Sequence, residues 1–237
     1  MRVYMISEPL IRWPAYAQFL TDEGLPGTET YRVAPRSCGE LLPEVAGRLC
    51  YMSYGKGRKS NKEYLDNIIK QQHFSVLEHA NWGFIITGIS RACTHEFVRH
   101  RHFSYSQLSQ RYVDHSEAKI VVPRDIEETS LGMMLESFSQ EGRDLYLQAV
   151  TELERDVETM SVIEKKRIRG IARAFLTEAT ETKIMVTGNA RAWREFIQKR
   201  NTTFADAEIR AVAQEILRQL LISAENVFND LESWPPE

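Results

Sequence analysis

Cysteine is scarce in this chain, and the three that are present, Cys38, Cys50 and Cys93, form no Cys-x-x-Cys pair. An odd number of cysteines without that spacing favours neither a disulfide framework nor a zinc knuckle. We therefore expect a protein of the reducing cytoplasm, whose fold is held without a disulfide or a metal.

Long apolar runs and a basic excess are missing as well. No stretch approaches the roughly 18 consecutive apolar residues of a membrane span, and residues 1–6 lack the apolar region of a signal peptide. The 30 lysines and arginines are outnumbered by 33 acidic residues, for a net charge of -3. A general nucleic-acid binder carries a basic excess, so we expect neither a nucleic-acid partner nor a membrane partner. Any recognition of phosphate must therefore be local.

The 237 residues show apolar patterns of both helical and strand period, without a repeat or linker that would divide them. Ser60-x-x-Glu63 and Ser161-x-x-Glu164 predict capping boxes at two helix starts. We expect one α+β domain over residues 1–237. The expected strands are 2–6, 82–90, 119–122 and 182–187, and the expected helices are 15–20, 40–51, 60–72, 91–99, 131–160, 161–176, 190–200 and 206–231.

The segment from Arg99 to Tyr112 has the most informative composition. It holds three arginines, two histidines, three serines and two tyrosines within 14 positions, and no lysine. Arginine grips phosphate bidentately, serine and glutamine read the edges of a heterocycle, and aromatic side chains stack on its face. The segment therefore predicts a nucleotide site. A solvated basic helix face is the alternative, but such a face has no reason to exclude lysine.

The same segment leaves other functions open. His100 and His102 could ligate the metal of a hydrolase, although a dication beside Arg99 and Arg101 would be repelled, and we expect no metal. Ser109 could be a hydrolase nucleophile, but no strand-Gly-x-Ser-x-Gly-helix elbow surrounds it. A non-catalytic nucleotide- or RNA-binding module would use the arginines, serines and tyrosines without any chemistry.

The segment resembles the signature of the flavin-dependent thymidylate synthases, in which Arg-His-Arg is followed by seven residues and a serine. The chain has that spacing in Arg99-His100-Arg101, the seven residues 102–108, and Ser109. Upstream, His73-Phe74-Ser75-Val76-Leu77-Glu78-His79 is similar to the family's His-x-Ser/Thr-x-x-Glu-His segment. Downstream, the family's C-terminal ligand-binding residues are matched in order by Arg173, Asn189-Ala190-Arg191 and Arg200.

Membership would imply a fold with a central, mostly antiparallel sheet flanked by long helices. It would also imply an enzyme that converts dUMP to dTMP, taking the one-carbon unit from methylenetetrahydrofolate and reducing equivalents from NADPH through FAD. The family is homotetrameric, with each active site assembled from several subunits. Its reduced flavin delivers the hydride and carries the one-carbon unit, so the protein's task is orientation and electrostatics.

The resemblance also implies roles for single residues. Arg200 would be catalytic, because a fixed guanidinium beside uracil lowers the pKa of N3; its position alone would make it a cation at a helix C-terminus. The implied flavin-binding residues are Ser75, Arg99, His100, Arg101, Gln107, Asn189, Ala190, Arg191 and Glu195. The implied dUMP-binding residues are Glu96, Phe97, Val98, Arg99, Gln107, Leu108, Ser109, Gln110, Arg111, Arg173 and Arg200.

Two positions depart from the family pattern. Glu195 stands where members more often have histidine or asparagine near the flavin, and Phe204 replaces a common histidine. A carboxylate there would disfavour a flavin anion unless it is paired, and we expect Arg191 or Arg194 as its partner. The basic loop over residues 53–59 has no implied role, and a mobile flap near a phosphate or folate tail would account for its charge.

Overall fold

A four-stranded antiparallel sheet forms the centre of the protein. The computed structural model describes residues 1–26, 37–154 and 160–234. The strands are β1 (Arg2–Ser7), β2 (Asn81–Ser90), β3 (Ser104–Gln107) and β4 (Glu181–Asn189), in the order β1-β2-β4-β3. Every neighbouring pair is antiparallel. The expected α+β class and antiparallel sheet are thus confirmed.

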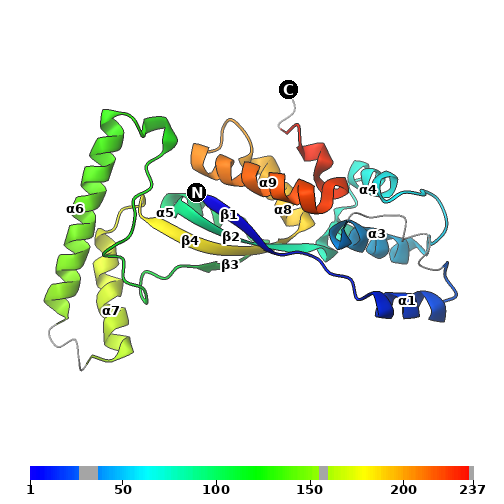
Figure 1. The fold of residues 1–237 in the computed structure, drawn as a ribbon, viewed down its shortest axis with the longest axis horizontal. Helices are drawn as coiled ribbons and strands as arrows, with labels where there is room; N and C mark the ends of the chain where they lie inside the picture. Colours follow the sequence, from blue (N-terminus) through cyan, green and yellow to red (C-terminus); the bar gives the residue numbers. More distant parts are fainter. Residues whose placement is uncertain (27–36, 155–159, 235–237) are drawn as a thin grey trace.

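Helices lie along one side of the sheet and beyond both of its ends. Figure 1 shows α5, α8 and α9 along one side, the α6–α7 pair beyond one end, and α1, α3 and α4 beyond the other. The helices are α1 (Trp13–Asp22), α3 (Cys38–Tyr51), α4 (Asn61–Lys70), α5 (Arg91–Phe97), α6 (Ser130–Leu153), α7 (Val162–Ala172), α8 (Ala190–Arg200) and α9 (Ala207–Phe228). Short 3₁₀ segments are η1 (Phe74–His79), η2 (Arg124–Ile126), η3 (Arg173–Phe175) and η4 (Asn229–Leu231). In the part of the chain that the structure describes, no helix is long and apolar enough to cross a membrane.

The predicted caps explain where several helices begin. Ser161 and Glu164 form the expected capping box at α7. Ser60 accepts a hydrogen bond from Glu63 N, but the Glu63 carboxylate returns to the backbone N–H of Lys59 instead of Ser60. These caps satisfy backbone donors that the first helical turn leaves unpaired.

An aromatic cluster packs the sheet against α5 and α8. The Phe97 and Phe196 rings stack with centroids 4.4 Å apart, and Phe84 meets Trp193 edge-on at 4.9 Å. Phe103, from the distinctive segment, lies 4.3 Å from the Trp193 ring. Burial of this much aromatic surface fixes the C-terminal ends of α5 and α8 relative to each other.

One predicted helix ends early, and one predicted strand is wrong. The expected helix from Arg91 through Arg99 is present but ends at Phe97. Residues 104–107, for which no element was predicted, form strand β3 by pairing with β4. The expected strand 119–122 is only an isolated bridge between Ile120 and Thr180. Two backbone hydrogen bonds, from Val121 N to Ala179 O (2.8 Å) and from Glu181 N to Lys119 O (2.8 Å), hold this irregular segment beside the start of β4.

Candidate active site

Arg200 reaches from the end of α8 to α5. Its Nε donates to Nε2 of His100 (3.0 Å), its Nη1 donates to the Glu96 carboxylate, and its Nη2 donates to the Glu96 carbonyl oxygen (3.4 Å). The side chain is 20% exposed. Partners about 100 positions away in the sequence therefore hold the guanidinium in place, so Arg200 is not only a solvated cation at a helix end.

His100 is neutral in this arrangement. Burial, followed by the positive charges of Arg200 and Lys199, lowers its pKa to about 4. Because Nε2 accepts from Arg200, we assign the proton of the neutral ring to Nδ1. Its ring meets Phe196 edge-on at 5.1 Å. Arg200 is therefore oriented by one carboxylate and one neutral imidazole.

The signature arginines surround a small hollow beside this group. A cavity of about 310 Å³ is lined by Arg99, His100, Arg101, His102, Phe103, Ala192, Glu195, Lys199 and Arg200. Arg99 and Arg101 are exposed, and within the described ranges neither has a carboxylate in ion-pair contact. Their guanidinium groups can therefore receive an anionic ligand.

Several of the residues implied as ligands also have roles inside the fold. Gln107 donates from Nε2 to the hydroxyls of Thr94 (2.9 Å) and Thr182 (3.3 Å), which joins β3 to α5 and β4. Phe97 is fully buried, so any contact it makes with dUMP would come from its backbone. Its neighbour Val98 is 40% exposed.

Ser109, Gln110, Arg111 and Arg173 form a second group beside α7. The Ser109 hydroxyl accepts from Arg111 N (3.2 Å), and the Arg111 side chain runs past Gly170 on α7. Arg173 is exposed where α7 passes into η3. Among the described residues, no hydrogen bond or ion pair joins this group to Arg200. None of the four lines the cavity of about 310 Å³ beside Arg200.

Two of the implied flavin contacts, Ser75 and Arg191, lie at or beside η1. Ser75 is exposed on η1, and Arg191 forms an ion pair of 2.6 Å with Glu78 of the same segment. The Asn189 side chain caps α8 by accepting from Ala192 N (2.9 Å). Ala190 is buried at the helix start.

The expected pairing of Glu195 is wrong. Its carboxylate bonds Lys199 (2.5 Å), one turn along α8, whereas the buried Arg194 pairs with Asp230 (2.5 Å). The hydrogen bond from Lys199 lowers the pKa of Glu195 although burial opposes the shift. Sequence reasoning missed Lys199, yet the Glu-to-Lys spacing of four residues on a helix could have indicated it. Phe204, the other departure, is 98% exposed.

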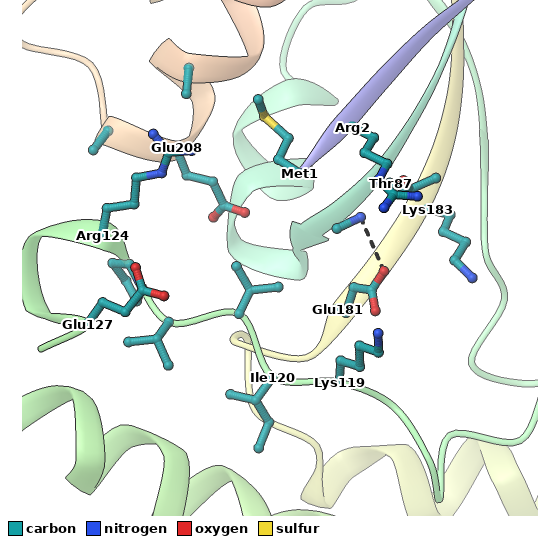
Figure 2. A pocket seen from close by; sticks show the side chains of 16 residues that line it. Met1, Arg2, Thr87, Lys119, Ile120, Arg124, Glu127, Glu181, Lys183 and Glu208 are labelled. Atoms are coloured by element: carbon teal, nitrogen blue, oxygen red, sulfur yellow. Dashed lines mark hydrogen bonds between the residues drawn. The ribbon is translucent and has the colours of Figure 1, made fainter.

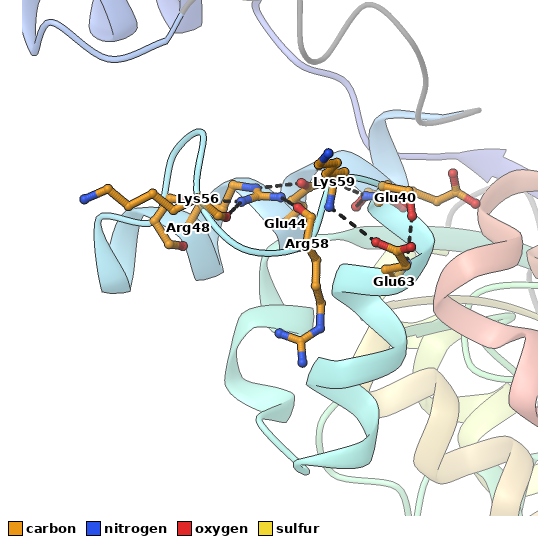
Figure 3. Close-up of polar contacts among 10 residues, drawn as sticks. Glu40, Glu44, Arg48, Lys56, Arg58, Lys59 and Glu63 are labelled. Atoms are coloured by element: carbon orange, nitrogen blue, oxygen red, sulfur yellow. Dashed lines mark hydrogen bonds and ion pairs between the residues drawn. The ribbon is translucent and has the colours of Figure 1, made fainter.

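The basic loop is fastened to α3. Arg48 and Glu44 form a buried ion pair of 2.6 Å, both side chains being 5% exposed. Arg48 also donates to the carbonyl oxygens of Ser53 (3.0 Å) and Arg58 (2.9 Å), as Figure 3 shows. A loop held by a buried guanidinium does not favour a freely opening flap, and that interpretation stays a prediction.

A further cavity, near the start of α9, contains none of the implied site residues. It measures about 810 Å³ and lies between the start of α9, the first residues of β1, and the segment around Ile120 (Figure 2). Its carboxylates serve the backbone: Glu181 accepts from Gly88 N (3.1 Å), and Glu208 accepts from Ser90 N (2.7 Å). Since Ser90 caps α5, the Glu208 carboxylate helps to position the helix that carries Glu96.

Within residues 1–26, 37–154 and 160–234, no group of three or more His, Cys, Asp or Glu side chains could hold a metal ion. The metal-dependent hydrolase therefore has no candidate centre there. All three cysteines are free thiols.

Comparison with known proteins identifies the family of the chain. The family described as thymidylate synthase complementing protein matches residues 37–223. A flavin-dependent thymidylate synthase of Mycolicibacterium vanbaalenii is 49% identical over 202 residues, covering 82% of this chain and 80% of that protein. Proteins of the same name from Mycobacterium marinum and Mycobacterium tuberculosis are each 48% identical over 200 residues, with the same coverage of 82% and 80%. The chain therefore belongs to the flavin-dependent thymidylate synthase family.

Proposed function

We propose that this protein converts dUMP to dTMP, with FAD as bound cofactor, methylenetetrahydrofolate as one-carbon donor and NADPH as reductant. The names of its relatives support a flavin and thymidylate synthesis. The observation that carries the proposal is the fixed position of Arg200 against Glu96 and His100, directly beside the signature arginines. The proposal includes a cytoplasmic location, in line with the free thiols.

The residues present fit part of a flavin dinucleotide. Arg99 and Arg101 offer exposed guanidinium groups that have no ion-pair partner among the described residues and suit a pyrophosphate, and Ser75 offers an exposed hydroxyl. When bound, the flavin would supply the hydride and carry the one-carbon unit. The cavity of about 310 Å³ is at the small end of ligand pockets, roughly 300–1,000 Å³, and FAD is a large ligand. A second surface must therefore complete the site.

For dUMP, the chain supplies orientation and charge. Arg200 would face the uracil edge and favour loss of the N3 proton, because an opposite charge nearby lowers a pKa. Glu96 and the neutral His100 hold its guanidinium plane. Arg111 and Arg173 would bind the phosphate, and Ser109 would donate a directional hydrogen bond without acting as a nucleophile.

The proposal includes a homotetramer with shared active sites. Arg200 of one copy would then meet Arg111 and Arg173 of another. The α6–α7 pair also carries exposed apolar side chains, which on a monomer mark a protein interface. They include Met133, Met134, Phe138, Val162 and Ile163, exposed by 64, 65, 64, 71 and 78%.

The proposal is tested by anaerobic turnover of the purified protein supplied with FAD. NADPH oxidation that depends on dUMP, with dTMP appearing only when methylenetetrahydrofolate is present, is the expected result. Protein that carries flavin but makes no dTMP from these substrates would contradict the proposal.

A further inference from the structure

The loop that follows β3, residues 108–118, carries the implied dUMP contacts Ser109 to Arg111 and lies against α6 and α7. Arg169 on α7 donates from Nη1 to the carbonyl oxygen of Tyr112 (2.7 Å). Arg143 on α6 donates from Nη1 to that of Ala118 (2.7 Å). Both halves of the loop are thus bound to the helix pair.

Between these two contacts, one hydroxyl holds the loop. Tyr146 on α6 is fully buried, and its oxygen accepts from His115 N (3.2 Å) and donates to Oδ1 of Asp114 (3.2 Å). The same Oδ1 accepts from Ser116 N (3.0 Å), which closes a turn. Tyr146 therefore contacts two consecutive loop residues at the centre of the loop.

Asp114 is charged at neutral pH in this turn. Burial would raise its pKa, but hydrogen bonds from Ser116 and Tyr146, with the charge of Arg169, lower it overall. A hydrogen bond to an ionised carboxylate is stronger than one between neutral groups. The Tyr146 hydroxyl therefore donates to a charged group of the loop.

The position of the loop also leaves some polar atoms buried without partners, which costs free energy. In the described structure, Gln110 Nε2, His115 Nε2 and Arg169 Nε are buried without a hydrogen-bond partner. Each belongs to the loop or to its anchor on α7. Buried, unsatisfied polar atoms cost free energy, so contacts such as that of Tyr146 must hold the loop in place.

The anchored turn leads directly to the implied substrate contacts. Val113 N donates to the Ser109 carbonyl oxygen (3.1 Å), and Arg111 N donates to the Ser109 hydroxyl (3.2 Å). We propose that Tyr146 is a positioning residue for the dUMP site, which acts through Asp114 and His115 to fix the turn that presents Ser109 to Arg111. This inference rests on the proposed function.

A packing role for Tyr146 can be separated from this one. Its ring belongs to a small core cluster with Val150, Ile168 and Ala172. Tyr146→Phe keeps the ring and removes only the hydroxyl. Tyr64→Phe is the matched control, because it removes the same atom from another mostly buried tyrosine, on α4 and outside the loop.

The test compares FAD-loaded, full-length wild type, Tyr146→Phe and Tyr64→Phe by calorimetric dUMP affinity, steady-state kinetics, FAD content and Tm. For Tyr146→Phe we expect the dUMP Kd and KM to rise about 3- to 10-fold, the range for one lost hydrogen bond, with kcat and FAD content nearly unchanged. Asp114→Ala should reproduce that split, and the double variant should add little to either change, since both remove one contact.

A Tyr146→Phe protein with wild-type dUMP affinity and KM would overturn the inference, as would parallel losses of FAD binding, dUMP binding and Tm. If Tyr146→Phe does not fold, Asp114→Ala against Tyr64→Phe gives the same comparison. Wild-type protein that neither binds dUMP nor makes dTMP contradicts the proposed function instead.

Discussion

Arg200 donates a hydrogen bond to His100 across 3.0 Å, and that contact requires the imidazole to be neutral. Protonation would remove the acceptor lone pair and place two cations in contact. Burial and Arg200 together hold the pKa of His100 at about 4, well below its usual value of 6.5. The contact between the guanidinium and the neutral ring therefore persists down to a pH of about 4.

This pair predicts a pH dependence of stability. Between pH 6.5 and about 4 the unfolded chain binds a proton at His100 that the folded chain excludes, so the unfolded state takes up more protons. The free energy of unfolding should therefore fall as pH falls through that window. Urea unfolding of wild type and His100→Gln at several pH values measures it, and the variant should lose part of the slope. Equal slopes would contradict the assigned pKa.

Arg200→Lys should impair dUMP binding and turnover far more than conservation of charge suggests. A lysine ammonium cannot contact His100, Glu96 and a uracil edge together, because it lacks the planar fork. Loss of a charge-assisted hydrogen bond, about 1.5 to 3 kcal/mol, predicts a fall of roughly 10- to 150-fold in dUMP affinity or rate, with FAD occupancy nearly unchanged.

The rate of Arg200→Lys should recover in part as pH rises, because hydroxide then removes the N3 proton without help. Arg218→Lys, an exposed arginine on α9, is the matched control. An Arg200→Lys variant with wild-type affinity and rate would return Arg200 to the role of a helix-end cation.

Ser109→Ala should retain appreciable turnover, and Ser109→Cys should do so too. The hydroxyl accepts a hydrogen bond from Arg111 N and is expected to bind dUMP, so its loss should cost about 0.5 to 1.5 kcal/mol. Steady-state kinetics measure the effect. A covalent adduct between Ser109 and dUMP in the mass spectrum would contradict the mechanism, as would loss of all turnover with FAD and dUMP still bound.

Shared active sites predict complementation between inactive variants. Arg200→Ala removes one part of the site and Arg173→Ala the other, so a mixed tetramer should contain some sites with both arginines intact. Co-expression with two affinity tags and purification through both measures the activity of the mixed assemblies. Activity no higher than that of either variant alone would argue for a site within one chain.

Removing Arg48 should destabilise the protein strongly. Glu44 would remain buried without its partner, which typically costs about 3–5 kcal/mol. Arg48→Met should therefore lower the free energy of unfolding by that order in urea titration. Lys62→Met, which breaks an exposed pair with Asp66, is the control and should change stability by less than about 1 kcal/mol.

Much of the fold could be predicted because local signals agree there. Residues 82–90 are rich in the β-branched and aromatic side chains typical of strands, and α8 has both a cap at Asn189 and a helical period. Strand β3 could not be predicted in this way. Its four residues have a composition suited to ligand binding, and they form a strand through long-range pairing with β4.

The site shows the same limit. The resemblance implies that Arg200 and Glu96 both contact dUMP, but it does not predict their contact with each other. That contact spans 104 positions and depends on the packing of α5 beside α8. By contrast, the Glu195–Lys199 pair needed only helical spacing.

The central claim is transfer of one carbon to dUMP, and its most direct test follows that carbon. Purified protein with FAD and NADPH should be given dUMP and methylenetetrahydrofolate labelled isotopically in the one-carbon unit, without oxygen. The account predicts dTMP whose methyl group carries the label, formed at least tenfold more slowly by Arg200→Lys. NADPH oxidation without labelled dTMP, under conditions where FAD and dUMP are bound, would contradict it.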